Sequence, residues 1–153
     1  MMLTPEQSAK IARLWVPVAG HLYVDPDDEN GGWWRVLEVV EGQITEMACE
    51  DGWICKPEDM VDFDLLAPCY WGDHATADGL PRTARAAWSD PTLHVTPTLS
   101  GKWTLNRIVG KEWQTWLPDG FAARIFANRD ESVRFDSEHD ALIAAILAAP
   151  EPA

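Results

Sequence analysis

Three cysteines and one histidine come closest, among the residues of this chain, to the make-up of a metal site. Cys49, Cys55, Cys69 and His74 follow the spacing C-x5-C-x13-C-x4-H. Structural zinc sites place two of their ligands only a few residues apart, and this set has no such close pair. An odd number of cysteines also argues against a disulfide framework. We therefore expect three ordinary half-buried thiols rather than a zinc site, and no metal or cofactor.

The most acidic loop, residues 25–32, has the ligand types of a calcium site but not their order. Asn30 stands where an EF-hand loop has glycine, Glu29 occupies the fifth position, and Val36 stands where the bidentate glutamate belongs. A solvated turn is the better interpretation of this loop, with weak cation binding as the alternative.

Side chains that could act in catalysis are present, but they follow no catalytic motif. No serine lies in a Gly-x-Ser-x-Gly elbow, and there is no glycine-rich phosphate loop or His-Glu-x-x-His. The four histidines are scattered through the chain: His21, His74, His94 and His139. The sequence does not predict an enzyme. A site assembled between two modules, as in a small hydrolase or nucleotide-acting enzyme, stays an alternative.

Charge is distributed very unevenly. Residues 1–80 contain 16 acidic and 4 basic residues, whereas residues 81–153 contain 9 and 8. Such a density of negative charge repels nucleic acid and anionic membranes and speeds encounter with basic proteins. We therefore expect no direct binding to nucleic acid. The acidic surface either keeps the protein soluble or binds a basic partner.

Length and composition indicate an ordered protein. The chain has 153 residues, of which 46% are apolar, and nine are tryptophans. Most of these tryptophans are expected in cores, and the others as interface anchors. No apolar run is long enough to cross a bilayer, and the N-terminus does not resemble a signal peptide. These features predict a cytoplasmic protein without a membrane partner, and leave its oligomeric state open.

Residues 31–66 have the pattern of short antiparallel strands joined by acidic turns. Residues 33–40 are rich in aromatic and β-branched residues, and Glu41-Gly42 sits between two apolar runs as a hairpin connection does. Strands are expected at 43–49, 53–55 and 61–65, with one helical turn at 57–60. No connection is long enough for a parallel crossover, so the pairing should be antiparallel.

This layout resembles the SH3-like barrels. The resemblance lies in the opening strand His21–Asp25, the pair Trp33-Trp34, and Pro57-x-x-Met60-Val61 before the last strand. It implies a small closed barrel, and a groove for polyproline ligands formed by Tyr23, Trp33, Pro57 and Met60.

A helix is predicted at the N-terminus, because Thr4 and Gln7 have the spacing of a capping box around Pro5. Its apolar stripe should pack on the barrel, and Pro17 should end it. Residues 67–91 carry five prolines and glycines with little periodicity, which is typical of a linker. The expected division is a module at 1–68, a linker at 69–91 and a second module at 92–150.

The second module is predicted to be an antiparallel sheet covered by one helix, with strands near 93–97, 102–108, 113–117, 121–126 and 132–135. Asp136-Ser137 precedes a clear amphipathic helix at 138–149. The fold class is therefore α+β. The motifs LHVTP, Gly-x-Trp and RFDSEHDAL resemble a family of short bacterial domains of unknown role, a likeness that implies no function.

The leading hypothesis is a non-catalytic protein that blocks a basic, nucleic-acid-binding protein or nucleoprotein complex by mimicking nucleic acid. Inhibitors of this type, including anti-CRISPR proteins, are made by phages and mobile elements. A structural or adaptor protein of a larger particle is a further alternative. The residues expected to bind the partner are one tryptophan and the acids around it: Asp25, Asp27, Asp28, Glu29, Trp33, Glu50, Asp51, Glu58, Asp59 and Asp62.

Overall fold

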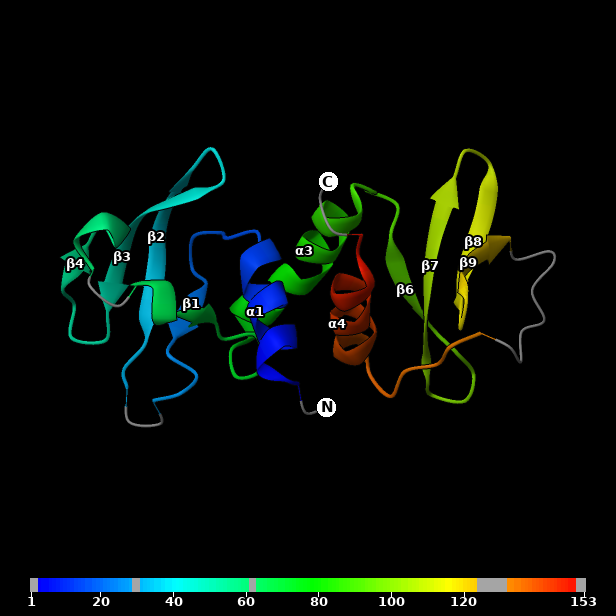
Figure 1. The fold of residues 1–153 in the computed structure, drawn as a ribbon, viewed down its shortest axis with the longest axis horizontal. Helices are drawn as coiled ribbons and strands as arrows, with labels where there is room; N and C mark the ends of the chain where they lie inside the picture. The colour runs from blue at the N-terminus through cyan, green and yellow to red at the C-terminus, as the bar shows by residue number, and fades with distance from the viewer. Residues whose placement is uncertain (1–2, 29–30, 61–62, 124–131, 151–153) are drawn as a thin grey trace. The chain divides into compact units, whose positions relative to one another are not determined.

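The computed structural model describes residues 3–28, 31–60, 63–123 and 132–150. It divides the chain into two compact units, which we call the central unit (residues 15–80) and the terminal unit (residues 1–14 and 81–153). Each unit contains one antiparallel sheet, and helices lie at both ends of the chain (Figure 1). The α+β class predicted from the sequence is confirmed.

The sheet of the central unit has five strands in the order β4-β3-β2-β1-β5. Their bounds are β1 Leu22–Val24, β2 Trp34–Val40, β3 Gln43–Cys49, β4 Ile54–Cys55 and β5 Ala67–Pro68. Strands β2 and β3 form the predicted hairpin, and Glu41 and Gly42 have φ of 52° and 79° in its turn. Two successive positive φ angles give the turn a twist that matches the twist of the strands.

The sheet is open, so the predicted closed barrel is not seen. Over the described residues, β4 pairs only with β3, and β5 pairs only with β1. The predicted turn near Pro57 is the 3-10 helix η1, Pro57–Asp59. The strand predicted at 61–65 is wrong where the structure describes it, because Phe63–Leu65 forms the 3-10 helix η2. Its first residues, 61 and 62, lie outside the described residues.

A bulge in β2 changes which side chains face the core. The register shifts between Val36 and Glu38 and again between Glu38 and Val39. An extra residue in one strand breaks the period-two alternation. Strict alternation predicts that Val36, Glu38 and Val40 share one face of the sheet. In the structure Val36 is buried, whereas Glu38 and Val40 are exposed. Val39 takes the half-buried position instead.

The core of the central unit combines sheet residues with an aromatic cluster. Trp15 stacks on Tyr70 with ring centroids 5.6 Å apart, and its indole Nε1 donates to Nδ1 of the buried His21 at 3.2 Å. Asp73 caps helix α2 (His74–Ala77), because its carboxylate accepts from the backbone N of Thr76 at 3.0 Å. Thr76 Oγ1 in turn accepts from the backbone N of Leu22 at 2.7 Å, which ties α2 to β1.

Residues 69–91 are not an irregular linker. They contain α2 and helix α3, Gly79–Trp88. The boundary between the units falls between Leu80 and Pro81 rather than after residue 68. Leu80 of the central unit and Ala84 of the terminal unit are fully buried. Prolines at the start of a helix are compatible with it, which explains why Pro81 does not prevent α3.

The N-terminal helix α1, Pro5–Leu14, begins with the predicted capping box. Thr4 N donates to Gln7 Oε1 at 2.9 Å, and Gln7 N donates to Thr4 Oγ1 at 3.1 Å. The helix packs against α4 in the terminal unit, which corrects the expectation that it packs on the barrel. Lys10 Nζ donates to the carbonyl oxygens of Leu147 and Ala149 at 2.8 and 2.9 Å. This ammonium satisfies carbonyls that the end of α4 leaves without partners.

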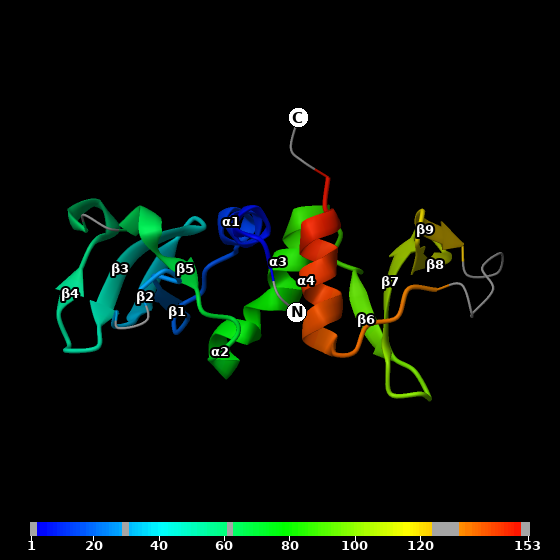
Figure 2. The ribbon, with the colours of Figure 1, turned by 60° about the horizontal axis from the view of Figure 1, so that its bottom comes forward.

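The sheet of the terminal unit is a meander in the order β6-β7-β8-β9. Its strands are β6 His94–Pro97, β7 Trp103–Val109, β8 Glu112–Leu117 and β9 Gly120–Ala123. Helix α4, Glu138–Ala148, contacts β6 and β7 and lies alongside them (Figure 2). Its predicted start is confirmed by Ser137, whose Oγ accepts from Asp140 N at 3.1 Å. Residues 132–135 form no strand, although Phe135 makes an isolated bridge to Trp103.

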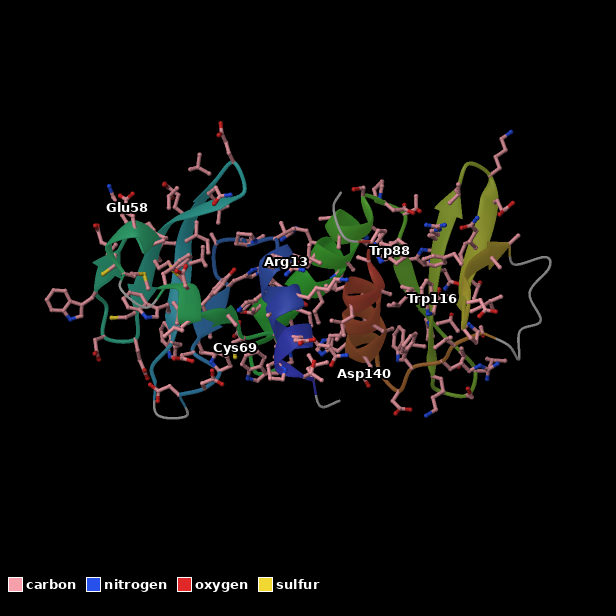
Figure 3. All side chains as sticks on the ribbon, in the orientation of Figure 1. Arg13, Glu58, Cys69, Trp88, Trp116 and Asp140 are labelled. Carbon is pink, nitrogen blue, oxygen red and sulfur yellow. The ribbon has the colours of Figure 1, made fainter. Side chains whose placement is uncertain are left out.

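An aromatic cluster joins the helices of the terminal unit to its sheet. Trp88 of α3 meets Trp116 of β8 edge to face with centroids 6.0 Å apart, and its Nε1 donates to the carbonyl of Ala145 in α4. The guanidinium of Arg107 lies 4.3 Å from the ring centre of Phe121. Figure 3 shows Trp88 and Trp116 between the helices and the sheet. Both indoles are half-buried. Of the nine tryptophans, Trp15 alone is buried, whereas Trp53, Trp71 and Trp113 are exposed.

Candidate functional site

The whole net charge of the protein belongs to the central unit. Residues 15–80 contain 15 acidic residues against Arg35 and Lys56, a net of −13. The terminal unit contains the remaining 10 acidic and 10 basic residues and is neutral. The negative charge is therefore separated more completely between the two compact units than between the two halves of the sequence. The candidate functional site is the acidic surface of the central unit.

Five of the predicted site residues come together at one end of the sheet. The β1–β2 connection carries Asp25, Asp27 and Asp28, and the β3–β4 turn carries Glu50 and Asp51. An antiparallel order puts both connections at the same end, opposite the β2–β3 hairpin, as Figure 1 shows. The connections also approach each other closely: a Cβ at Gly32 would lie 2.9 Å from Glu50 Oε2.

These carboxylates are presented to solvent. Asp27, Glu50 and Asp51 are exposed, and no hydrogen bond or ion pair joins their carboxylates to another described residue. Asp28 is also exposed, while Asp25 is half-buried and its Oδ1 accepts from the backbone N of Asp27 at 2.9 Å. The loop is therefore shaped in part by its own carboxylates, and most of its charge faces outward.

Two further acids of the predicted site lie on η1. Glu58 and Asp59 are exposed, and their carboxylates are likewise unpaired among the described residues. Figure 3 shows Glu58 on the outer side of the central unit, beside β4. The 3-10 helix that carries these two acids contacts β3. Glu29 and Asp62 lie outside the described residues.

Trp33 is half-buried just before β2. The guanidinium carbon of Arg35 lies 5.4 Å from its ring centre, within the range of a cation–π contact. Arg35 also donates from Nη1 to the carbonyl of Gly20 at 3.0 Å. Trp33 thus lies against one of the two cations of the central unit, and part of its ring is already covered.

Acidic side chains also face each other within the sheet. Glu38 of β2 lies directly opposite Glu46 of β3 in the antiparallel register. Like charges at directly opposite positions destabilise a sheet. Thr45 Oγ1 donates to Glu38 Oε1 at 2.6 Å, which offsets part of that cost for one of the two carboxylates. Negative charge is therefore present near the hairpin of the sheet as well as at its opposite end.

Two residues that sequence reasoning missed stand at the edge of this surface. Trp53 is 73% exposed and Ile54 is 60% exposed, at the start of edge strand β4. Glu50 and Asp51 precede them in the chain, and Glu58 and Asp59 follow. The signal was available in part: a large apolar pair directly after an Asp-Gly turn, in a short strand that has few neighbours to cover it.

The polyproline groove implied by the resemblance finds limited support. Tyr23 is only 8% exposed, and desolvation raises the pKa of its hydroxyl far above its ordinary value. Its ring offers little surface to a ligand. Pro57 and Met60 are half-buried, as is Trp33. The resemblance to SH3-like barrels and the binding of polyproline remain predictions.

The described residues include no group of three or more histidine, cysteine, aspartate or glutamate side chains placed to hold a metal ion. Cys49, Cys55 and Cys69 are free, and they are half-buried as expected. Burial is the main reason that the pKa of the Cys69 thiol is raised, with the nearby charge of Asp73 acting in the same direction. A neutral thiol is a poor nucleophile and metal ligand.

A polar cluster on the sheet of the terminal unit is the other group of side chains that could bind a ligand. Asn106 is buried, and its Nδ2 donates to Thr96 Oγ1 at 3.0 Å and Thr104 Oγ1 at 3.2 Å. Its Oδ1 accepts from Thr115 Oγ1 at 2.9 Å. These bonds use both donors and the acceptor of the amide, so the cluster is satisfied internally and stabilises the sheet.

Comparison with known proteins adds no relative: no protein-family model, no curated protein and no solved structure matches this chain. Over the part of the chain that the structure describes, no helix combines the length and the apolar character needed to span a bilayer.

Proposed function

We propose that this protein is a non-catalytic inhibitor whose central unit binds a basic, nucleic-acid-binding protein or nucleoprotein complex in place of nucleic acid. The observation that carries the proposal is the confinement of the net charge of −13 to residues 15–80. A solubilising surface does not need such a division, since charge spread over both units would serve equally well. A surface that competes with phosphates does need its charges in one place.

The state of the carboxylates supports the same function. Asp27, Glu50, Asp51, Glu58 and Asp59 are exposed and unpaired among the described residues. Charges that are not neutralised inside the protein remain available to lysine and arginine of a partner. The pair Glu38 and Glu46 is a local cost to the sheet that a bound cation would relieve. Proteins of this type occur in phages and mobile elements, where they block host defence systems such as CRISPR complexes.

The test is capture from a bacterial lysate by the full chain at low and at high salt, followed by elution with duplex DNA or with RNA. The proposal expects saturable capture of nucleic-acid-binding proteins that salt weakens and nucleic acid reverses. The decisive variant reverses Asp27, Asp28, Glu58 and Asp59 to lysine. Its control reverses four acids of the terminal unit, Glu6, Glu112, Asp119 and Glu138, for the same change in net charge.

Electrostatic mimicry predicts that the first variant loses capture and that the control keeps it. Equal affinity of both variants for the captured protein would refute the mimicry, because the position of the charge would then not matter. Circular dichroism and thermal unfolding of both variants would establish that each is folded before the comparison.

A further inference from the structure

The edge of the central sheet at β4 combines three properties that rarely occur together on a free surface. It is a strand edge that no other described strand covers, it presents two large apolar side chains, and unpaired carboxylates lie before and after it in the chain. Exposed apolar residues next to polar ones mark interaction sites more often than isolated ones do. An interaction surface is therefore the natural interpretation of this edge.

The backbone of β4 has groups available for pairing. Trp53 O accepts from Cys49 N at 2.9 Å, and Cys55 lies opposite Met47 in the register. Ile54 lies between these two positions, opposite Ala48. In an antiparallel pair, alternate residues turn their N–H and C=O groups away from the partner strand. The N–H and C=O of Ile54 therefore point toward the open edge, where an extended segment could accept and donate hydrogen bonds.

The side chains set the chemistry of that segment. The Trp53 ring, which is 73% exposed, can accept an arginine or lysine by a cation–π contact, whereas Ile54 requires an apolar neighbour. Glu50 and Asp51 precede β4 in the chain and Glu58 and Asp59 follow it, with Lys56 the one basic residue between them, so the net charge near the strand favours a basic segment. A second copy of this chain fits poorly, because each central unit carries a net charge of −13.

We propose that β4 is the docking edge for an extended, basic segment of a partner protein. The segment adds as a strand beside Ile54, rests a cationic side chain on Trp53, and places its other cations against the flanking acids. Strand addition of this kind takes affinity from main-chain hydrogen bonds and specificity from alternate side chains. The inference rests on the proposed function and specifies which part of the acidic surface anchors the partner.

The probe is a fluorescent peptide of alternating arginine and valine, because that pattern is extended, basic and apolar on one face. Its affinity is measured by anisotropy for the full chain and for the variants Trp53→Ala and Ile54→Ala. The matched control is Trp71→Ala, which removes another exposed tryptophan of the same unit, 58% exposed. A second peptide with N-methyl groups at alternate residues keeps its charge but cannot pair as a strand.

The expected result is a loss of about tenfold or more for Trp53→Ala and Ile54→Ala, since anchor residues dominate such interfaces. Trp71→Ala should bind as the unaltered protein does, and the N-methylated peptide should bind at least about tenfold more weakly. Because both anchors are largely exposed, neither variant should lower the melting temperature. Amide NMR spectra should show the Trp53 indole and the Ile54 backbone shifting on titration.

Three results would overturn the proposal. The first is a peptide affinity that falls when Glu58 and Asp59 are reversed but not in Trp53→Ala or Ile54→Ala. The acidic side chains would then bind the peptide, and the β4 edge would not. The second is the absence of peptide binding to the full chain. The proposed function would then be tested separately, by the capture experiment from lysate. The third is concentration-dependent self-association that Trp53→Ala abolishes, which would make the edge an interface between copies.

Discussion

Glu38 of β2 and Glu46 of β3 lie directly opposite each other across an antiparallel pair. The sheet keeps two like charges at positions where an opposite charge would stabilise it. Thr45 is the one described hydrogen-bond partner of either carboxylate. The central unit thus gives up stability at this acidic pair. A basic partner bound near this pair would reduce the repulsion between the two carboxylates, as the proposed binding role requires.

Removing one charge of this pair should stabilise the free protein. We expect Glu46→Gln to raise the free energy of unfolding by about 0.2–1 kcal/mol, because it ends the repulsion and retains the length of the side chain. Added salt should stabilise the unaltered protein more than the variant, since salt screens exposed charges. Urea unfolding at two salt concentrations measures both effects. A variant less stable than the parent at low salt would contradict this account of the pair.

Gly79 begins α3 at a point where the central unit leaves no space for a side chain. A Cβ there would lie 2.7 Å from Trp15 Cζ2 and 2.8 Å from His21 Cε1, and both rings are buried. We expect Gly79→Ala to destabilise the protein by about 1–3 kcal/mol through overpacking. At Gly72, the nearest atom to an added Cβ is Cys69 Sγ at 3.4 Å, an ordinary contact. Thermal unfolding should therefore show Gly72→Ala close to the parent, and equal stability of the two variants would contradict the predicted clash.

Asp73 should make the stability of the central unit depend on acid pH. Burial raises the pKa of this carboxyl group, but hydrogen bonds from Thr76 N and Oγ1 and the charges of Arg35 and His74 together lower it below its ordinary value. A lowered folded-state pKa stabilises the fold above the unfolded-state value of about 3.9. That contribution is lost as the pH falls through the folded-state pKa.

The check is urea unfolding of the parent and of Asp73→Asn between neutral pH and strongly acidic pH. Asparagine can still cap a helix, so the variant removes the negative charge and keeps a capping side chain. The parent should be more stable at neutral pH, and the difference should shrink as the pH falls below about 4. A difference that does not vary with pH would show that the charge of Asp73 contributes nothing.

The cluster around Asn106 gives a prediction for the terminal unit. Asn106→Leu should cost about 1–3 kcal/mol, because it leaves the hydroxyl of the buried Thr115 without its acceptor. Adding Thr115→Val should recover part of that loss, since replacing both partners removes the unsatisfied group. A double-mutant cycle by chemical unfolding measures the coupling. Strictly additive effects would show that the hydrogen bond between them does not stabilise the sheet.

Local hydrogen bonding explains the elements that were predicted well. The capping box of Thr4 and Gln7, the turn at Glu41-Gly42 and the start of α4 after Ser137 each depend on residues at most a few positions apart. Neighbouring residues alone decide such structures, so the pattern of residue types is sufficient to predict them. The same holds for the α+β class, which follows from the order of periodic segments.

Long-range packing decided what the sequence could not. The apolar stripe of α1 fits any apolar surface, and only the fold brings Lys10 to the carbonyls of Leu147 and Ala149. The bulge in β2 and the open edge at β4 depend on pairing between strands. For this reason the exposure of Trp53 could be inferred from the sequence only in part.

By itself, the sequence determined the composition of the acidic site and its separation from the basic residues, because charge is a property of residue type. It also determined the short elements whose hydrogen bonds close within a few residues. Only the tertiary structure decided where one unit ends and the other begins, and which apolar side chains stay uncovered. Burial depends on neighbours that are distant in the chain, and residue types alone do not say which of those neighbours will meet.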